Sequence, residues 1–66
     1  MDRVTPEPVA VAPATAAAML GIGRSRFYAL LHDGEIKSFR LGRRRLIRVS
    51  DLHALIERLA AREQAA

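Results

Sequence analysis

Arginine is the residue type whose number and spacing in this chain most clearly indicate a chemistry. Residues 21–50 hold eight of the eleven basic side chains of the 66-residue sequence but only two acidic ones, Asp33 and Glu35. This segment therefore carries a net charge of +6, while the rest of the chain sums to −2. Guanidinium groups bind phosphate oxygens through charge-assisted hydrogen bonds. Their concentration in one segment predicts a binding patch for a polyanion and not a diffuse basic surface.

The length and composition of the chain exclude several classes of protein. A chain of 66 residues forms one domain with one modest core, because it buries only about 60% of the surface that its unfolded form exposes. It has no cysteine, which excludes disulfides and thiolate metal sites. It has neither an apolar run of roughly 18 residues nor the charged start and apolar core of a signal peptide. We therefore expect a cytoplasmic protein without membrane partners.

The arginines lie within a predicted helix-turn-helix. The first helix is expected to begin at Pro13, whose fixed φ suits the first helical position, and to end at Gly21. The second is expected to start near Gly23 or Arg24 and to end before Gly34, which supplies the left-handed conformation common at helix C-termini. Because only three residues separate the two helices, they must cross sharply.

The second helix is expected to pack with one face and to leave the other free for a ligand. At about 100° per residue, three apolar side chains share the packing face: Phe27, Leu30 and Leu31. The opposite face and its flanks carry Ser25, Arg26, Tyr28, Ala29 and His32.

After the second helix the hydrophobic period changes from helical to two. Phe39 and Leu41 alternate with polar residues, and Ile47 and Val49 repeat the alternation. This pattern predicts two strands joined by a tight turn at Gly42, where a positive φ is easily adopted. This placement puts Arg43 and Arg44 at the tip of the hairpin, and Arg45 and Arg48 along the return strand.

A third predicted helix closes the core over the hairpin. Ser50 is a good N-cap, and Asp51 is a favourable charge in the first turn. Four apolar residues follow at helical spacing, namely Leu52, Leu55, Ile56 and Leu59. The expected fold is mainly α with a small β-hairpin, a winged helix-turn-helix of order α-α-β-β-α. We expect residues 1–10 to form a flexible arm, 11–62 the DNA-binding domain and 63–66 a frayed tail.

With these elements in place, the sequence resembles the excisionase family of small winged helix-turn-helix proteins, relatives of the MerR DNA-binding domain. The resemblance covers residues 11–60, and it rests on the order and spacing of four fragments: 16–28 (AAAMLGIGRSRFY), 33–36 (DGEI), 40–44 (RLGRR) and 51–52 (DL). It implies a bacterial or phage origin. It also implies that the second helix enters the major groove of double-stranded DNA, and that the hairpin is a wing on the DNA backbone or minor groove.

Members of this family act as recombination directionality factors, which bend attachment-site DNA and recruit integrase, or as small transcriptional regulators. The partners implied here are double-stranded DNA, integrase or other DNA-bound proteins, and further copies of this chain bound cooperatively to DNA. No cofactor and no small-molecule substrate is implied. Bound to DNA, the protein is expected to be associated with the nucleoid.

Three positions depart from the family pattern. Gly23 stands where Ser or Thr usually caps the recognition helix, so the N–H groups of its first turn are left for a phosphate. Ala29 occupies a position that is often Arg or Lys, which removes one expected DNA contact. The first helix has alanines where the family often has glutamates.

Two sets of residues form the predicted DNA-binding site. Arg26 is the best candidate for reading a guanine, and short side chains beside it allow close approach to the major groove. The wing arginines should add mainly sequence-independent affinity through counterion release, or enter a narrow minor groove. The recognition-helix residues are Arg24, Ser25, Arg26, Tyr28, Ala29 and His32, and the wing residues are Arg40, Gly42, Arg43, Arg44 and Arg45.

Several alternatives stay open at this point. Tyr28 is either a partly buried core aromatic or a phosphate contact, and it is the one aromatic outside the predicted core. With so few exposed aromatics, RNA binding is a weaker hypothesis. A protein-interaction adaptor that grips an acidic partner is another. An enzyme is not expected, because no His, Cys or carboxylate cluster has the spacing of a catalytic or metal site.

Overall fold

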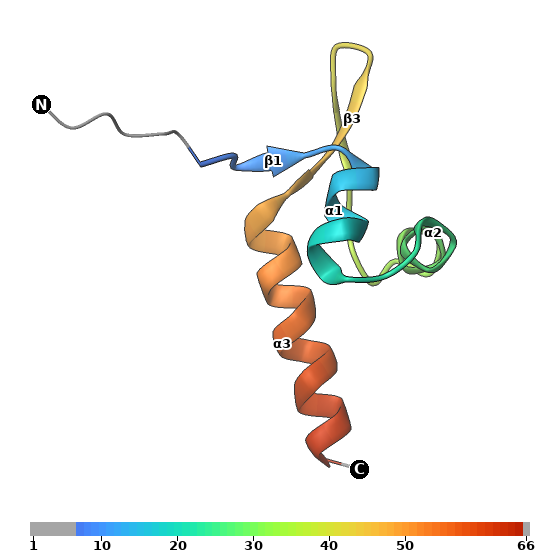
Figure 1. The fold of residues 1–66 in the computed structure, drawn as a ribbon, viewed down its shortest axis with the longest axis vertical. Coiled ribbons are helices and arrows are strands. Elements are labelled where there is room, and N and C mark those ends of the chain that lie inside the picture. Colours follow the sequence, from blue (N-terminus) through green and yellow to red (C-terminus); the bar gives the residue numbers. More distant parts are fainter. Residues whose placement is uncertain (1–6, 66) are drawn as a thin grey trace, which may run out of the picture.

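The computed structural model describes residues 7–65, which form three helices and three short strands joined by loops. In chain order they are β1 (Ala10–Val11), α1 (Pro13–Leu20), α2 (Arg24–His32), β2 (Phe39–Leu41), β3 (Arg44–Arg48) and α3 (Val49–Ala65). Figure 1 shows α1 and α2 in the middle of the fold, with the β2–β3 hairpin projecting at one end and α3 extending toward the other. Residues 1–6 of the expected arm and residue 66 of the expected tail lie outside the described residues.

The predicted fold class is confirmed, and both helices of the helix-turn-helix end as expected. Gly21 follows α1 with a φ of +75°, and the N–H of Ile22 donates to the carbonyl of Ala17 at 3.0 Å. The end of α2 repeats this hydrogen-bonded motif, with Gly34 at a φ of +78°. Glycine suits both positions because it has no Cβ to clash in the left-handed region.

Both helices begin without a side-chain cap, as Gly23 predicts for the second. Pro13 is the first residue of α1, and Ala12 before it offers no side-chain hydrogen bond to the helix. Gly23 precedes α2 in an extended conformation and also offers none. The two helices therefore depend on tertiary packing for their stability.

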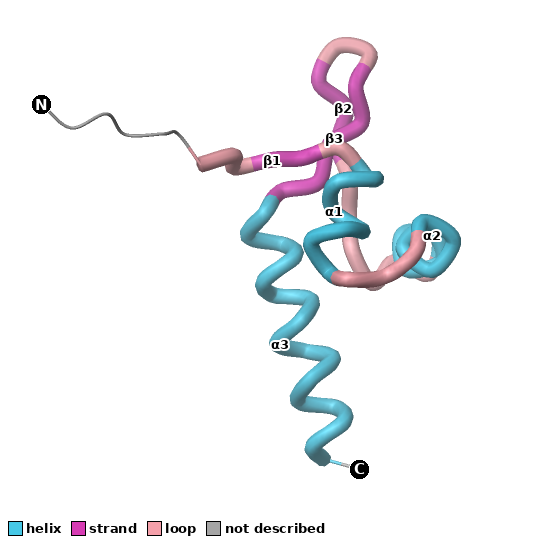
Figure 2. Tube along the Cα trace, in the orientation of Figure 1, coloured by secondary structure: helices cyan, strands magenta, loops and turns pink. Residues whose placement is uncertain are grey.

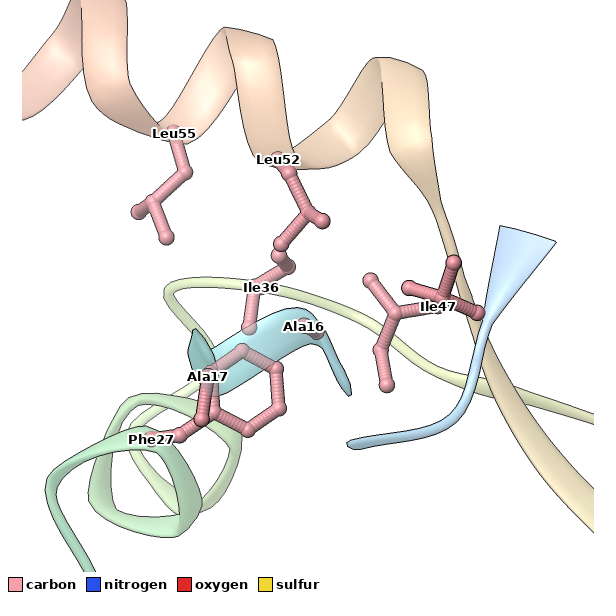
Figure 3. Close-up of a cluster of buried hydrophobic side chains, with 8 residues drawn as sticks. Ala16, Ala17, Phe27, Ile36, Ile47, Leu52 and Leu55 are labelled. Carbon is pink, nitrogen blue, oxygen red and sulfur yellow. The ribbon is translucent and has the colours of Figure 1, made fainter. Parts of the chain in front are cut away.

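The core lies between the helix-turn-helix, the base of the hairpin and α3. Figure 3 shows Leu52 and Leu55 pointing from α3 toward Ile36 and Phe27. The two small side chains of α1 that face this cluster let the neighbouring elements approach closely. The buried residues are Val11, Ala16, Ala17, Phe27, Ile36, Ile47, Leu52 and Leu55.

The turn between β2 and β3 decides which side chains of the hairpin face the core. Gly42 and Arg43 form a two-residue turn, so that Leu41 faces Arg44 and Phe39 faces Leu46. Directly opposed residues point to the same side of a sheet. Phe39 and Leu41 therefore lie on the face opposite to that of the buried Ile47, and their side chains are 39% and 66% exposed. This corrects the prediction that Tyr28 is the one aromatic outside the core.

The strand β1 is not among the predicted elements. It pairs antiparallel with β3, so the sheet has the order β1-β3-β2. Val11 lies opposite Ile47 and is buried, and the N–H of Val49 donates to the carbonyl of Val9 at 2.9 Å. A strand of two residues is too short for a period-two pattern to predict. It takes in Ala10, the last residue of the expected arm.

The boundaries and the buried face of α3 differ from the prediction. The helix begins at Val49, so Ser50 lies in its first turn and is not its N-cap. It continues to Ala65, through residues for which a frayed tail is expected. Leu52 and Leu55 are buried, but Ile56 is 46% exposed, because it lies beyond the edge of the packed face. No helix among residues 7–65 is both long and apolar enough to cross a membrane.

Candidate nucleic-acid interface

The six predicted residues of the recognition helix all lie on α2 and are all exposed. Phe27 on the opposite side is fully buried, with Leu30 and Leu31 partly buried beside it. These apolar contacts fix the rotation of α2 about its axis, so the polar side must face solvent. The helix therefore presents Arg24, Ser25, Arg26, Tyr28, Ala29 and His32 together on its exposed surface.

Tyr28 is partly packed against the core and partly exposed. Its ring packs edge-on against the ring of Phe27, with 6.3 Å between the centroids and 75° between the planes. Half of the side chain is nevertheless exposed. The ring is thus anchored on the core while the residue remains accessible to a ligand.

The wing arginines are distributed over both faces of the hairpin and its tip. Arg40 faces Arg45 on the side of the sheet that continues toward Ile47, while Arg44 lies on the other side next to Leu41. Arg43 is in the turn. Arg44 is the first residue of β3 and lies directly after the turn. The sequence pattern instead places it at the tip together with Arg43. Figure 2 shows this hairpin standing clear of the helices.

Arg45 is held against the wing by a neutral partner. One of its terminal nitrogens donates to the hydroxyl of Ser38 at 2.6 Å. Ser38 lies nearer the base of the hairpin, so the guanidinium is oriented back along the ribbon and not toward the tip. Because a hydroxyl carries no charge, Arg45 keeps its full positive charge for a ligand.

Three other arginines are paired with acids. Arg48 binds Asp51 through two hydrogen bonds of 2.9 and 3.0 Å. Arg62 and Arg58 on α3 contact a carboxylate oxygen of Glu35 at 3.1 and 3.6 Å. Arg58 also donates to the backbone carbonyl of Glu35. These pairs connect the segment after α2, and the end of β3, to α3.

The hydrogen bond and the charge of Arg62 lower the pKa of Glu35 below its ordinary value of 4.5, and Arg58 adds to this effect. Glu35 is one of only two acids in the basic segment. Because its carboxylate is engaged by α3, it does not neutralise the arginines of α2 or the wing.

The remaining basic side chains of residues 7–65 have no acidic partner within 4.0 Å among those same residues. All of them are exposed, and all lie between the start of α2 and the start of β3. Lys37, in the loop before β2, belongs to this group although it is not among the predicted site residues. In the sequence, only the high positive charge of residues 21–50 points to this lysine. The group consists of Arg24, Arg26, Lys37, Arg40, Arg43, Arg44 and Arg45.

The recognition helix and the wing form two separate cationic surfaces. Among the described residues, no side-chain hydrogen bond or ion pair joins them. Figure 1 shows the hairpin projecting above α1, while α2 lies beside α1 and is seen end-on. A ligand that contacts both must itself be extended, as a polyanion is. Residues 7–65 contain no group of three or more His, Asp or Glu that could hold a metal ion.

A helix-turn-helix followed by a β-hairpin and a closing helix defines the class of winged helix-turn-helix domains. Residues 13–60 match the family described as "Helix-turn-helix domain". The chain belongs to this helix-turn-helix domain family.

The chain is also similar to a protein of Saccharopolyspora erythraea described as "Probable excisionase". The two are 41% identical over 64 residues, which cover 97% of this chain and 65% of that protein. Together with the family match, this similarity confirms the predicted resemblance to excisionase-family helix-turn-helix proteins. The relation to MerR stays a prediction. No solved structure matches the chain significantly.

Proposed function

We propose that this protein binds double-stranded DNA as an excisionase-type architectural or regulatory protein, with residues 11–62 as its DNA-binding domain. The family and the similarity to a protein named as a probable excisionase support this proposal. One structural observation carries it: seven exposed basic side chains between Arg24 and Arg45 have no acidic partner within the described residues, whereas Arg48, Arg58 and Arg62 do. A dense group of unpaired surface cations is typical of a protein that binds a phosphate backbone.

In this proposal α2 lies in the major groove. A helix of nine residues fits a groove about 12 Å wide. Ser25 and Ala29 are short enough to let the helix approach the bases, and Arg26 reads a guanine by donating to its O6 and N7. Arg24 lies at the uncapped N-terminus of α2, where the free backbone N–H groups favour a phosphate.

The wing arginines provide affinity more than specificity. Arg40, Arg43, Arg44 and Arg45 contact phosphates and release condensed counterions. Such contacts position the protein on the duplex, and they carry little information about base sequence.

The finer role is that of a recombination directionality factor, which bends attachment-site DNA and assists an integrase, or that of a small transcriptional regulator. One short recognition helix reads few base pairs. Useful specificity therefore requires several protomers on adjacent sites.

The salt dependence of binding tests the proposal. Selection from a random pool of duplexes gives a preferred sequence, and its affinity is then measured across a salt series. We expect the logarithm of the affinity to fall against the logarithm of salt concentration with a slope of about −4 to −6 per protomer, since each phosphate contact contributes roughly −0.9. A flat response would exclude DNA as the ligand of the basic surface.

Cooperativity is tested by gel shifts on duplexes that carry one, two or three copies of the selected sequence. We expect tighter and cooperative binding to the repeated sites. Equal affinity per site for single and repeated copies would exclude the multi-protomer form of the proposal while leaving DNA binding intact.

A second candidate function has one observation in its favour. An apolar groove of about 620 Å³ lies between α2 and α3, and Arg26 is among the residues that line it. An adaptor that binds an acidic, partly apolar protein segment would use such a groove. The groove is lined by Leu20, Ile22, Arg26, Ala29, Leu30, Ile56 and Leu59.

The substitution Arg26→Ala distinguishes the two functions. A DNA reader loses discrimination between the selected duplex and a scrambled one, while an adaptor has no such discrimination to lose. The substitution Ile56→Ser, which changes the groove but not the basic surface, weakens binding only in the adaptor case.

A further inference from the structure

The wing has an apolar surface that the protein itself does not cover. Leu41 is 66% exposed directly before the turn, and Phe39 is 39% exposed on the same face of the hairpin. Leu46, which faces Phe39, is partly buried beside it. Removing an exposed apolar side chain from water lowers the free energy, so a dry contact at the tip of this projecting hairpin would be favourable. Exposure alone does not distinguish Leu41, since Val9 is 82% exposed. The place of Leu41 near the tip of a projecting hairpin, beside arginines that have no acidic partner among the described residues, is what indicates contact with a ligand.

The cations around Leu41 indicate what that ligand is. Arg40 lies on one face of the hairpin, Arg44 on the other beside Leu41, and Arg43 in the turn. None of the three has an acidic partner within the described residues. A hairpin lying flat on one phosphate backbone would use the cations of one face only. Cations on both faces suit a groove, which has a phosphate backbone along each wall.

The turn leaves the tip narrow at this point. Gly42 has a φ of +65° and no side chain, and a Cβ built there would meet no atom within 4 Å. Nothing on the protein thus separates Leu41 from a surface that meets the tip.

We infer that Leu41 is an apolar wedge that enters the minor groove at the wing tip and partly unstacks two adjacent base pairs, which kinks the duplex. This inference rests on the proposed function and states how the DNA would be bent. Leucine is among the side chains that minor-groove proteins insert between base steps, and the resulting kinks open the groove. Arg40 and Arg44, which lie on opposite faces of the hairpin, then bind phosphates on its two walls. Flexible pyrimidine–purine steps are the preferred sites, since they unstack most easily.

The experiment uses the full chain and the duplex selected from the random pool. Donor and acceptor dyes at the duplex ends report bending, and 2-aminopurine placed at successive positions reports unstacking. Leu41→Ala removes the wedge, and Leu41→Met retains an apolar side chain of similar length. Val9→Ala is the matched control, because Val9 is 82% exposed but lies next to β1, away from the hairpin tip.

We expect the wild-type protein to bend the duplex and to raise 2-aminopurine fluorescence at one step. Leu41→Ala should lose most of both signals and bind about tenfold more weakly, with an unchanged salt slope because no charge is removed. Leu41→Met and Val9→Ala should behave like the wild type. Circular dichroism should show that all the variants are folded, since both substituted residues are exposed.

Two results would overturn the inference about Leu41 and leave the proposed function intact. One is a wild-type protein that binds the selected duplex with neither bending nor unstacking. The other is a Leu41→Ala variant that bends and unstacks the duplex as the wild type does. If the wild-type protein binds no duplex at all, the proposed function fails as well.

Discussion

The basic segment from α2 to the wing and the closing helix α3 use the same residue type in opposite ways. On α3, Arg58 and Arg62 reach the carboxylate of Glu35. In the basic segment, arginines such as Arg26 and Arg43 have no acid within ion-pair distance among the described residues. Helix α3 uses arginine to hold the fold together, and the basic segment keeps the charge of its arginines available.

This difference shows that the number of arginines does not define a binding surface. An arginine beside an acid has its charge compensated, and its removal affects the packing of the fold. An arginine without such a partner adds to the long-range potential that attracts a polyanion. The structure therefore separates the basic side chains into two groups that the charge count treats as one.

The largest expected effect comes from removing the buried residue that carries the recognition helix. Phe27→Ala should cost about 3 to 5 kcal/mol of stability, through lost burial and the cavity left behind. A domain this small has a total stability of similar size, so both regions should be lost together. Thermal unfolding followed by circular dichroism measures this. Tyr28→Ala, on the exposed side of the same ring pair, should retain the folded signal, and equal loss in both variants would contradict the assignment of Phe27 as the anchor.

Removing two positive charges from each region tests the comparison directly. The double substitution Arg43→Gln and Arg44→Gln should reduce the steepness of the salt dependence of DNA binding by about 1.8, roughly 0.9 for each contact. The same change at Arg58 and Arg62 should leave the slope unaltered and lower stability instead. A slope that falls equally in both double variants would show that the paired arginines also bind DNA.

A smaller effect is expected at the turn of the wing. Gly42 has a φ of +65°, and an alanine there should cost about 1 kcal/mol, because its Cβ disfavours the left-handed region. Urea denaturation measures the loss. Gly42→Asn is the matched control, because asparagine adopts the left-handed region more readily than alanine does. It should lose clearly less stability than the alanine variant, and an equal loss in both would contradict the strain argument.

The smallest effect concerns the ion pairs of Glu35 and appears as a pH dependence. The pKa of Glu35 is lowered in the folded protein, so its charged form favours folding. This contribution is fully present above the ordinary pKa of 4.5 and is lost as the pH falls through the lowered value. Glu35→Gln should therefore reduce the difference between urea midpoints at pH 7 and pH 3.

Glu57→Gln is the control for this measurement. Glu57 is exposed on α3 and takes part in none of the ion pairs among the described residues. This variant should keep the pH dependence of the wild type. An unchanged pH dependence in the Glu35 variant would show that the pairs with α3 contribute nothing to folding.

The helix-turn-helix could be predicted from the sequence because its signals are local. Pro13, Gly21 and Gly34 mark helix boundaries through backbone geometry that depends on the residue itself. The burial of Phe27 follows from the helical period of its neighbours. The exposed residues of α2 could thus be identified before any coordinates were known.

The wing and α3 could be predicted only in outline. The two-residue turn at Gly42 sets a register that places Phe39 and Leu41 on the outer face, and a shift of one residue would have reversed this. Periodicity shows that Phe39 and Leu41 share a face, but it does not show which face meets the core. The exposure of Ile56 likewise depends on which side of α3 the other elements cover, since Leu59, further along the helix, is packed against the core.

The sequence by itself determined the helices, the hairpin and the concentration of positive charge, because these depend on residues near one another in the chain. Only the tertiary structure decided which arginines keep their charge available. Glu35 meets Arg58 and Arg62 across 23 and 27 positions of sequence, and such contacts form only when packing brings distant segments together. The same packing left Glu35 bound to α3 and the arginines of α2 and the wing exposed.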